Sequence, residues 1–203
     1  MQTAIVIPAR LASERFPRKM LHPLCGRPLI YWTWRAALET GLPVFVATDS
    51  DEIAAALPTG AHVLPTRAAA NGTERCAQAL HKLAAEYVIN WQGDSPTVPA
   101  RVALALAARQ ADFCTPVIPG PVLWTGTTFK RQWQHVGMYG YTRASLERYA
   151  AAPPSSDELT ERLEQLRFAA LGVPTTVVPV DPFPYAEVNY PGDVSAAEAI
   201  LCC

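Results

Sequence analysis

Four basic side chains stand close together near the start of the chain, among the small residues and prolines of residues 8–19. They are Arg10, Arg15, Arg18 and Lys19. The apolar, β-branched residues 1–7 before them predict a buried strand, and a loop at the carboxyl end of the first strand of an α/β sheet lies where such folds bind ligands. Guanidinium and ammonium groups at that place suit a polyphosphate, whereas a solvated basic loop would explain the cations alone.

A carboxylate follows another predicted strand, at residues 87–91. The next residues read Gln92-Gly93-Asp94-Ser95-Pro96. A single carboxylate beside phosphate oxygens is a usual way for a protein to hold Mg²⁺, but aspartate in a glycine-containing turn is also an ordinary turn former. Because the carboxyl ends of parallel strands meet at one edge of a sheet, we expect Asp94 to face the same crevice as the basic loop.

Two later clusters of polar residues have both a structural and a functional interpretation. Residues 71–75, Asn-Gly-Thr-Glu-Arg, have the chemistry of a helix start, which accounts for everything except Arg75. On a strand at residues 134–141, alternation puts His135, Gly137, Tyr139 and Tyr141 on one face. A lone histidine on a strand is more often a hydrogen-bonded core residue than a catalyst.

Apolar runs bounded by turn residues alternate with helical patterns along the chain. This alternation predicts an α/β fold with a mostly parallel central sheet and helices on its faces. Strands are expected at 3–7, 43–47, 62–64, 87–91, 113–117, 134–141 and 175–180. Helices are expected at 29–39, 51–56, 73–86, 99–109, 143–150, 157–169 and 191–201, and a loop or hairpin at about 118–130.

Composition limits the possible classes of protein. The 203 residues, 50% of them hydrophobic, suit one folded domain, and a net charge of −1 gives no electrostatic case for nucleic acid or an anionic membrane. We expect a cytoplasmic chain, since no apolar stretch could span a bilayer and the start lacks signal-peptide features. Five cysteines without a CxxC pair predict reduced thiols, with Cys202 and Cys203 in an exposed tail open to oxidation.

Taken in order, these motifs resemble those of the nucleotidyltransferases that activate sugars. The resemblance is closest to the cytidylyltransferases that make CMP-3-deoxy-manno-octulosonate, and it extends from Ile5 to about Val194. It implies a Rossmann-like, three-layer sandwich in a single domain, with a nucleotide-binding part at about 1–112 and an acceptor-binding part at about 113–203. It also implies CTP as the nucleotide and Mg²⁺ as the cofactor.

The resemblance assigns the nucleotide side by position. The basic loop wraps the triphosphate in that family, so Arg10, Ser13, Arg15 and Lys19 are implied phosphate ligands, while Arg18 falls at a free position and is expected to be an exposed cation. The other implied nucleotide-binding residues are Pro8, Ala9, Arg67, Gly72, Thr73, Arg75 and Gln92. Among these, Gly72, Thr73 and Arg75 are expected to read cytosine, and Asp49 is expected to be structural.

The metal side departs from the family pattern. The Gln-Gly-Asp turn is its metal-binding turn, which implies Asp94 as a ligand, but Ser95 stands where the family usually has glutamate. The family's later Val-Asp-Thr-Pro run reads Val-Asn-Tyr-Pro at 188–191. Asn189 therefore offers the metal a neutral carbonyl in place of an anionic ligand, and we expect weak metal affinity without nucleotide.

The acceptor side is shortened. His135, Tyr139 and Gln165, with Glu164 behind them, are implied to bind the acceptor; Arg167 is expected either to pair with the acceptor carboxylate or to pair with Glu164. Family members carry a long segment before the His-x-Gly-x-Tyr strand, used around the sugar and in dimer contacts, of which only 118–134 remains here. A homodimer is compatible with the resemblance, and the short segment favours a compact acceptor.

The implied reaction is a Mg²⁺-dependent transfer of CMP from CTP to an anionic acceptor, with release of pyrophosphate. The default acceptor is a sugar acid of the 3-deoxy-manno-octulosonate type; the alternatives are a small phosphonate such as phosphonoformate in secondary metabolism, and an inactive nucleotide-binding homologue. Arg10, Arg15, Lys19 and Asp94 are the expected catalytic residues, and the base is either His135 or a metal-acidified hydroxyl. The chain lacks both GxGxxG after its first strand and Gly-Lys-Ser/Thr, which argues against a dinucleotide oxidoreductase and a P-loop NTPase.

Overall fold

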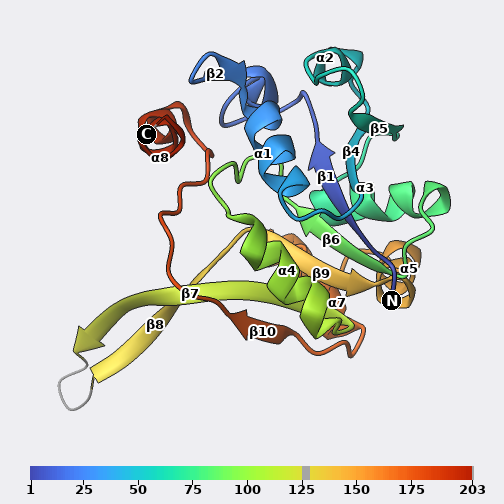
Figure 1. The fold of residues 1–203 in the computed structure, drawn as a ribbon. Helices are drawn as coiled ribbons and strands as arrows, with labels where there is room; N and C mark the ends of the chain where they lie inside the picture. Colours follow the sequence, from blue (N-terminus) through green and yellow to red (C-terminus); the bar gives the residue numbers. More distant parts are fainter. Residues whose placement is uncertain (125–128, 203) are drawn as a thin grey trace.

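A central sheet of eight strands forms the middle layer of the computed structural model, which describes residues 1–124 and 129–202 (Figure 1). The strand order is β5-β4-β1-β6-β9-β7-β10, and β8 pairs with β7. The strands are β1 (Thr3–Ala9), β4 (Val44–Thr48), β5 (His62–Pro65), β6 (Tyr87–Trp91), β7 (Phe113–Trp124), β8 (Phe129–His135), β9 (Met138–Thr142) and β10 (Thr176–Pro179). A separate small hairpin pairs β2 (Pro23–Leu24) with β3 (Arg27–Pro28).

Helices cover both faces of the sheet. They are α1 (Leu29–Leu38), α2 (Asp51–Ala55), α3 (Gly72–Ala79), α4 (Ala100–Arg109), α5 (Arg143–Ala151), α6 (Ser156–Glu161), α7 (Leu166–Ala170) and α8 (Val194–Leu201). The strand β1 is buried along its whole length, and its side chains alternate between two apolar cores. Ile5 and Ile7 pack in the core that includes α1, α4 and α8, whereas Ala4 and Val6 pack in the one that includes α3, α5 and α7.

The position of β1 determines where a ligand can bind. It pairs in parallel with β4 on one side and with β6 on the other. After β1 the chain builds β4 and β5 on one side and then returns to form β6 on the other. The carboxyl ends of such strands open a crevice where the strand order reverses. The predicted α/β fold with a mostly parallel sheet and flanking helices is confirmed, and no described helix is long and apolar enough to cross a membrane.

Three predicted elements are interrupted in the structure. The helix expected at 73–86 ends at Ala79 and continues only as a short 3₁₀ helix, Leu80–Lys82. The strand expected at 134–141 breaks at Val136 and Gly137, because β8 pairs with β7 whereas β9 also pairs with β6. The helix expected at 157–169 is divided at Arg162, which takes a left-handed backbone conformation with φ 55°. Hydrophobic periodicity extends across each interruption, so the pattern alone cannot reveal it.

The segment predicted as a loop or hairpin is a long hairpin. Figure 1 shows β7 and β8 projecting from the body of the molecule. The register has an irregularity between Pro119 and Val122, as expected where prolines interrupt a ladder. Residues 125–128 of the predicted segment lie outside the described residues.

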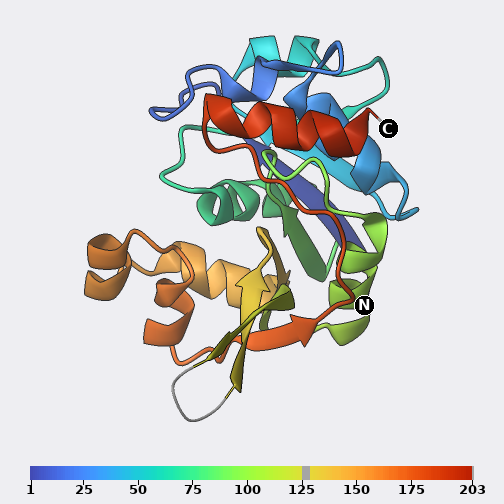
Figure 2. The same cartoon turned by 90° about the vertical axis from the view of Figure 1, so that its left-hand side faces the viewer.

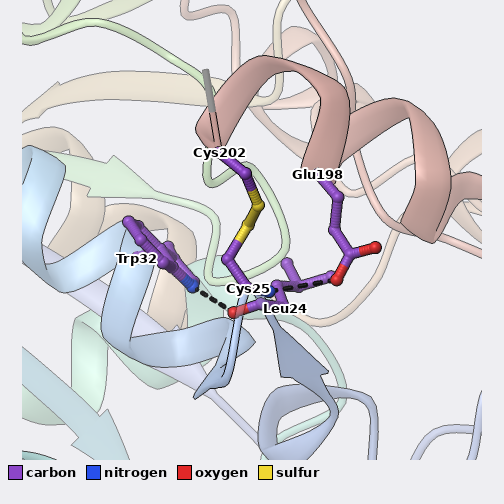
Figure 3. The surroundings of a disulfide bond; sticks show 5 residues. All are labelled: Leu24, Cys25, Trp32, Glu198 and Cys202. Atoms are coloured by element: carbon purple, nitrogen blue, oxygen red, sulfur yellow. Dashed lines mark hydrogen bonds between the residues drawn. A yellow bond between two sulfur atoms is a disulfide. The ribbon is translucent and has the colours of Figure 1, made fainter.

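The C-terminal segment returns to the N-terminal half of the molecule. After β10 it runs along the sheet to α8, as Figure 2 shows. At the end of α8, Cys202 forms a disulfide with Cys25, with their Cα atoms 6.1 Å apart (Figure 3). Beside it, the Cys25 N–H donates to Glu198 Oε1 over 3.0 Å, and Trp32 Nε1 donates to the Leu24 carbonyl over 2.8 Å.

This disulfide corrects the cysteine prediction. Cys202 is exposed, as predicted, but it is not a free thiol in a tail: the disulfide fixes it at the end of α8, because the fold brings together residues 177 positions apart. Sequence spacing gives no sign of such a long-range pairing. The free cysteines among the described residues, Cys76 and Cys114, are both buried, and Cys203 lies outside the described part of the chain.

We expect Cys202→Ser to lower the melting temperature under oxidising conditions by about 5–15 °C, because the cross-link closes a very long loop that typically contributes about 2–4 kcal/mol. The measurement is thermal unfolding with and without dithiothreitol. Reductant should lower the melting temperature of the wild type to nearly that of the variant and should leave the melting temperature of the variant unchanged. A wild-type melting temperature that does not change with reductant would contradict the presence of the cross-link.

Candidate active site

A large cavity opens at the carboxyl ends of β1, β4 and β6. Its volume is about 1630 Å³, and its lining combines the basic loop after β1, Asp49 after β4, and Gln92 and Asp94 after β6. The residues predicted for the nucleotide side that line it are Pro8, Ala9, Arg10, Ser13, Arg15, Lys19, Gly72, Arg75 and Gln92. The fold therefore brings the basic loop and the acidic turn to one place, as the strand order predicts.

Lys19 and Asp94 form an ion pair in the wall of this cavity. Lys19 Nζ lies 2.6 Å from Asp94 Oδ2, and Lys19 is only 6% exposed. Thr33 Oγ1 donates to the Gly93 carbonyl over 2.8 Å, which fixes the turn that carries Asp94. Burial of a charge requires a partner of opposite sign, so each of these two groups holds the other at the cavity wall.

The two arginines beside Lys19 differ in their surroundings. Arg15 Nη2 donates to Asn189 Oδ1 over 3.1 Å, and its guanidinium lies over the Tyr190 ring at 5.3 Å from the centroid. Arg18 is more than half exposed and pairs with Glu52 of α2. Arg18 is thus an exposed cation, as expected, whereas Arg15 links the basic loop to the C-terminal segment.

A close packing of three predicted nucleotide-side residues closes one end of the cavity. A β-carbon at Gly72 would lie 2.9 Å from Gln92 Nε2 and 3.2 Å from Pro8 Cγ. Gln92 in turn donates to Asn90 Oδ1 over 3.2 Å. A larger residue at this position would have to displace the Gln92 amide, which lies between β1 and the start of α3.

A second cavity of about 340 Å³ adjoins the first. The two share Arg15, Gln92, Asp94 and the 163–165 turn in their walls. The residues predicted for the acceptor side that line the smaller cavity are His135, Tyr139, Glu164 and Gln165, and the metal candidate Asn189 lines it as well. The His135 ring stacks against Tyr139 at 5.5 Å, and Gln165 hydrogen-bonds the Tyr139 hydroxyl. Asp94 therefore stands between the two cavities.

Three predicted site residues lie outside both cavity linings. Arg67 is exposed; its backbone N–H donates to Gln78 Oε1 over 2.8 Å, and its carbonyl accepts from Arg75 Nη1 over 3.4 Å. The Thr73 side chain is buried, with its hydroxyl 2.9 Å from that of Tyr141. Arg167 is 2% exposed and pairs with Glu158 at 2.6 Å and Glu74 at 3.1 Å.

The expectation that Arg167 pairs with the acceptor or with Glu164 is corrected. The guanidinium of Arg167, on α7, contacts α3 and α6 through Nε and Nη2, and its Nη1 donates to the Ala152 carbonyl at the end of α5. Arg75 lines the large cavity, but its guanidinium contacts Asp49 at 3.0 Å and Thr66 at 2.5 Å. That contact assigns Arg75 a positioning role for residues 66–67 and agrees with the structural role expected for Asp49.

Glu164 is a titratable group of the site whose pKa is moved towards neutral pH. Desolvation raises its pKa to about 7, and the charges of Glu158 and Glu74 act in the same direction. The hydrogen bond from the Thr73 backbone N–H, 3.1 Å long, lowers the pKa but does not offset the burial. Burial thus keeps the protonated form of Glu164 available at a higher pH than for an exposed glutamate.

We expect Glu164→Gln to change how stability depends on pH. The folded pKa lies above the unfolded one, so the contribution of Glu164 to stability falls as pH rises from about 4.5 to about 7. The melting temperature of the variant, compared with that of the wild type, should therefore rise between pH 5 and pH 8. The check is thermal unfolding of both proteins across this range, with Glu161→Gln as an exposed control. If the difference in melting temperature between the variant and the wild type did not change with pH, the raised pKa of Glu164 would be contradicted.

Glu187 also lines the smaller cavity and was not predicted from the sequence. The signal was present, because Glu187 stands two residues before Asn189 and side chains of an extended segment alternate. Tyr185 was missed too; its hydroxyl accepts a hydrogen bond from the Gly137 N–H over 3.1 Å. Neither Glu187 nor Tyr185 belongs to a motif recognised in the sequence.

Oxygen atoms dominate the donor set between the cavities. The carboxylates of Asp94 and Glu187 and the amide of Asn189 face the smaller cavity. Within residues 1–124 and 129–202, no group of three or more histidine, cysteine, aspartate or glutamate side chains could hold a metal ion. A sparse oxygen set suits a cation that keeps water and phosphate ligands, as Mg²⁺ does.

Comparison with known proteins identifies the family. Residues 4–115 match the family model described as "Cytidylyltransferase". The chain belongs to the cytidylyltransferase family. The prediction of a nucleotidyltransferase enzyme is thereby confirmed, and the large cavity is built mainly from the matched half of this cytidylyltransferase.

Its relatives extend the likeness over nearly the whole chain. A 3-deoxy-manno-octulosonate cytidylyltransferase of Methylobacterium radiotolerans is 35% identical over 97% of this chain and 96% of its own. A 3-deoxy-manno-octulosonate cytidylyltransferase of Chlorobium luteolum is 38% identical over 85% of this chain and 86% of its own. Among solved structures, a CMP:2-keto-3-deoxy-manno-octonic acid synthetase complexed with CTP superposes with a TM-score of 0.88 at 28% identity, covering 100% of this chain and 99% of that one. The resemblance stated from the motifs is confirmed.

The comparison also supports a shortened chain. The alignment with the Methylobacterium radiotolerans protein is 237 positions long, whereas this cytidylyltransferase has 203 residues. The relative therefore holds residues without a counterpart here.

Proposed function

We propose that this cytidylyltransferase transfers CMP from CTP to 3-deoxy-manno-octulosonate, releases pyrophosphate and uses Mg²⁺. The observation that carries the proposal is the meeting of two cavities at Asp94, a large one bordered by cations and a smaller one bordered by hydrogen-bonding side chains. The names of the relatives and the CTP in the similar solved structure support this choice of acceptor and nucleotide.

The basic loop would receive the triphosphate. An acceptor hydroxyl oxygen attacks the α-phosphorus of CTP in line and gives up its proton, for which His135 in the wall of the smaller cavity is the candidate base. A new oxygen–phosphorus bond forms, and the bond to the bridging oxygen of pyrophosphate breaks. Arg10, Arg15 and Lys19 would neutralise the charge that develops on the leaving pyrophosphate. Such transfer asks mainly for positioning and charge neutralisation.

The oxygen-rich wall between the cavities fits Mg²⁺. Asp94 and Asn189 would hold the ion; when bound, it neutralises phosphate charge and polarises the reacting phosphoryl group. Lys19 holds Asp94 at the wall by their ion pair, and Arg15 holds Asn189 beside it. On the acceptor side, Tyr139, Gln165 and His135 would orient the sugar acid by hydrogen bonds.

We expect CTP to exceed UTP in kcat/KM by at least about tenfold, because uracil presents an acceptor where cytosine presents a donor. A site matched to one base leaves buried groups unpaired with the other, at about 1–3 kcal/mol per group. Pyrophosphate release with each nucleotide and a fixed acceptor measures the ratio. Equal rates would contradict the assignment of CTP and leave a nucleotidyltransferase with another base preference.

The test of the acceptor is a comparison of kcat/KM for 3-deoxy-manno-octulosonate and for small phosphonates such as phosphonoformate, with CTP and Mg²⁺. The proposal requires the octulosonate to be the better substrate. The shorter chain favours the small phosphonate as a second candidate, because a reduced wall loses contacts to distal hydroxyls. CTP binding without turnover of any acceptor would instead favour the inactive homologue.

A further inference from the structure

Glu187 lies in the segment between β10 and α8 and borders the smaller cavity together with Asp94 and Asn189. The neighbouring Val188 is fully buried in the core, and its N–H donates to the Asp94 carbonyl over 2.9 Å. The C-terminal segment is thus fastened to the turn that carries Asp94. With Val188 directed into the core, the residues on either side of it both face the cavity.

An unpaired polar group faces the same space as Glu187. Ser95 is fully buried, and its Oγ lies beside the Tyr185 hydroxyl without making a hydrogen bond of good geometry within the described part of the chain. A β-carbon at Gly137 would lie 2.8 Å from Glu187 Oε1 and 3.2 Å from Ser95 Oγ. The carboxylate and the hydroxyl therefore face one small space that glycine keeps open. A polar occupant of this space would pair with the Glu187 carboxylate and the Ser95 hydroxyl together and would so stabilise the site.

The charges around this space favour a divalent cation. The wall of the smaller cavity carries the carboxylates of Asp94, Glu164 and Glu187 and the guanidinium of Arg15, and Asn189 supplies a neutral oxygen between Asp94 and Glu187. Mg²⁺ in phosphate-transfer sites is held by one or two carboxylates together with phosphate oxygens and waters. A site made of Asp94 and Asn189 has one negative protein ligand, whereas Glu187 provides a second.

We infer that Glu187 is the second carboxylate ligand of the Mg²⁺ site, so that the negative charge absent at Asn189 stands two residues earlier. Asn189 then contributes its neutral oxygen or holds Arg15. The inference deepens the proposed function and rests on it, since it concerns the metal of that same reaction. It explains how a chain with asparagine at this position keeps two anionic groups beside the nucleotide.

The first experiment measures Mn²⁺ binding without nucleotide, from the loss of the electron paramagnetic resonance signal of free Mn²⁺. Glu187→Gln should weaken binding about tenfold or more, comparable to the 10–100-fold effects of altering groups around a metal. Glu161→Gln, an exposed acid on α6, is the matched control and should bind like the wild type. The double variant Glu187→Gln/Asn189→Asp moves the charge by two residues and should restore most of the affinity.

The outcomes separate this inference from the proposed function. Equal affinity of Glu187→Gln and Glu161→Gln would overturn the role of Glu187, while weakened binding in Asp94→Asn would still support a metal at Asp94. Absence of Mn²⁺ binding by the wild type would contradict both. A crystal structure of the wild type with Mn²⁺ and CTP gives a test that needs no variant to fold. The anomalous peak should lie about 2.2 Å from a Glu187 oxygen, close to the 2.0–2.1 Å typical of Mg²⁺, and a peak on Asp94 without contact to Glu187 would overturn the inference.

Discussion

Asp94→Asn should lower kcat by about 10³-fold or more, the largest effect expected of any single substitution in this protein. The substitution keeps the shape of the side chain and an oxygen that can accept from Lys19, but removes the negative charge that both cavities share. Loss of charge stabilisation of a transferring phosphoryl group costs several kcal/mol. The measurement is pyrophosphate release at saturating CTP, acceptor and Mg²⁺.

The control for this substitution is Asp181→Asn, which removes one charge from an exposed residue after β10. Its kcat should stay within about twofold of the wild type, since isolated surface substitutions usually change little. Thermal unfolding of both variants checks that the fold is kept. If Asp94→Asn retained a tenth of the wild-type rate with its fold intact, Asp94 would not be the metal-holding residue of the reaction.

The sequence predicts the fold well wherever a local pattern and a tertiary environment agree. β1 and β6 are short apolar runs, and both are central strands in the structure, with β6 at the predicted residues 87–91. The predictions that required long-range information were less complete. Arg162 ends α6 in a left-handed conformation, and the pairing of Cys25 with Cys202 depends on the return of the C-terminal segment.

In the candidate site, too, the residues that follow a local pattern were predicted and those placed by long-range contacts were not. Residues of the basic loop and the acidic turn follow directly after strands, so the strand order alone brings Arg15 and Asp94 together. Arg167 was misplaced because helix spacing offered Glu164 as its partner, whereas the turn at Arg162 brings Glu158 and Glu74 to it. Glu187 was missed because it belongs to a segment without regular secondary structure, whose direction is fixed by the Val188 N–H and the buried Val188 side chain.

Arg15→Ala should lower kcat/KM by about 10²–10³-fold, because Arg15 lines the walls of both cavities. From there its guanidinium can stabilise the negative charge of the bound triphosphate and of the departing pyrophosphate. Removing one charge-assisted contact that stabilises a transition state costs about 2.7–4 kcal/mol in well-studied cases. The effect on folding should be small, since Arg15 is exposed and its contacts are one hydrogen bond to Asn189 and the face of Tyr190.

A matched control lies in the same region of the chain. Arg27 is also exposed and lies over an aromatic ring, Tyr31, at 5.4 Å from the centroid, close to the 5.3 Å between Arg15 and Tyr190. It borders neither cavity. Arg27→Ala therefore removes the same charge and the same kind of cation–π contact, worth about 0.5–1 kcal/mol at an exposed site, without touching the ligand. Steady-state kinetics should separate the two variants by about two orders of magnitude, while their melting temperatures stay close. Equal kinetics would mean that Arg15 serves only to hold the C-terminal segment.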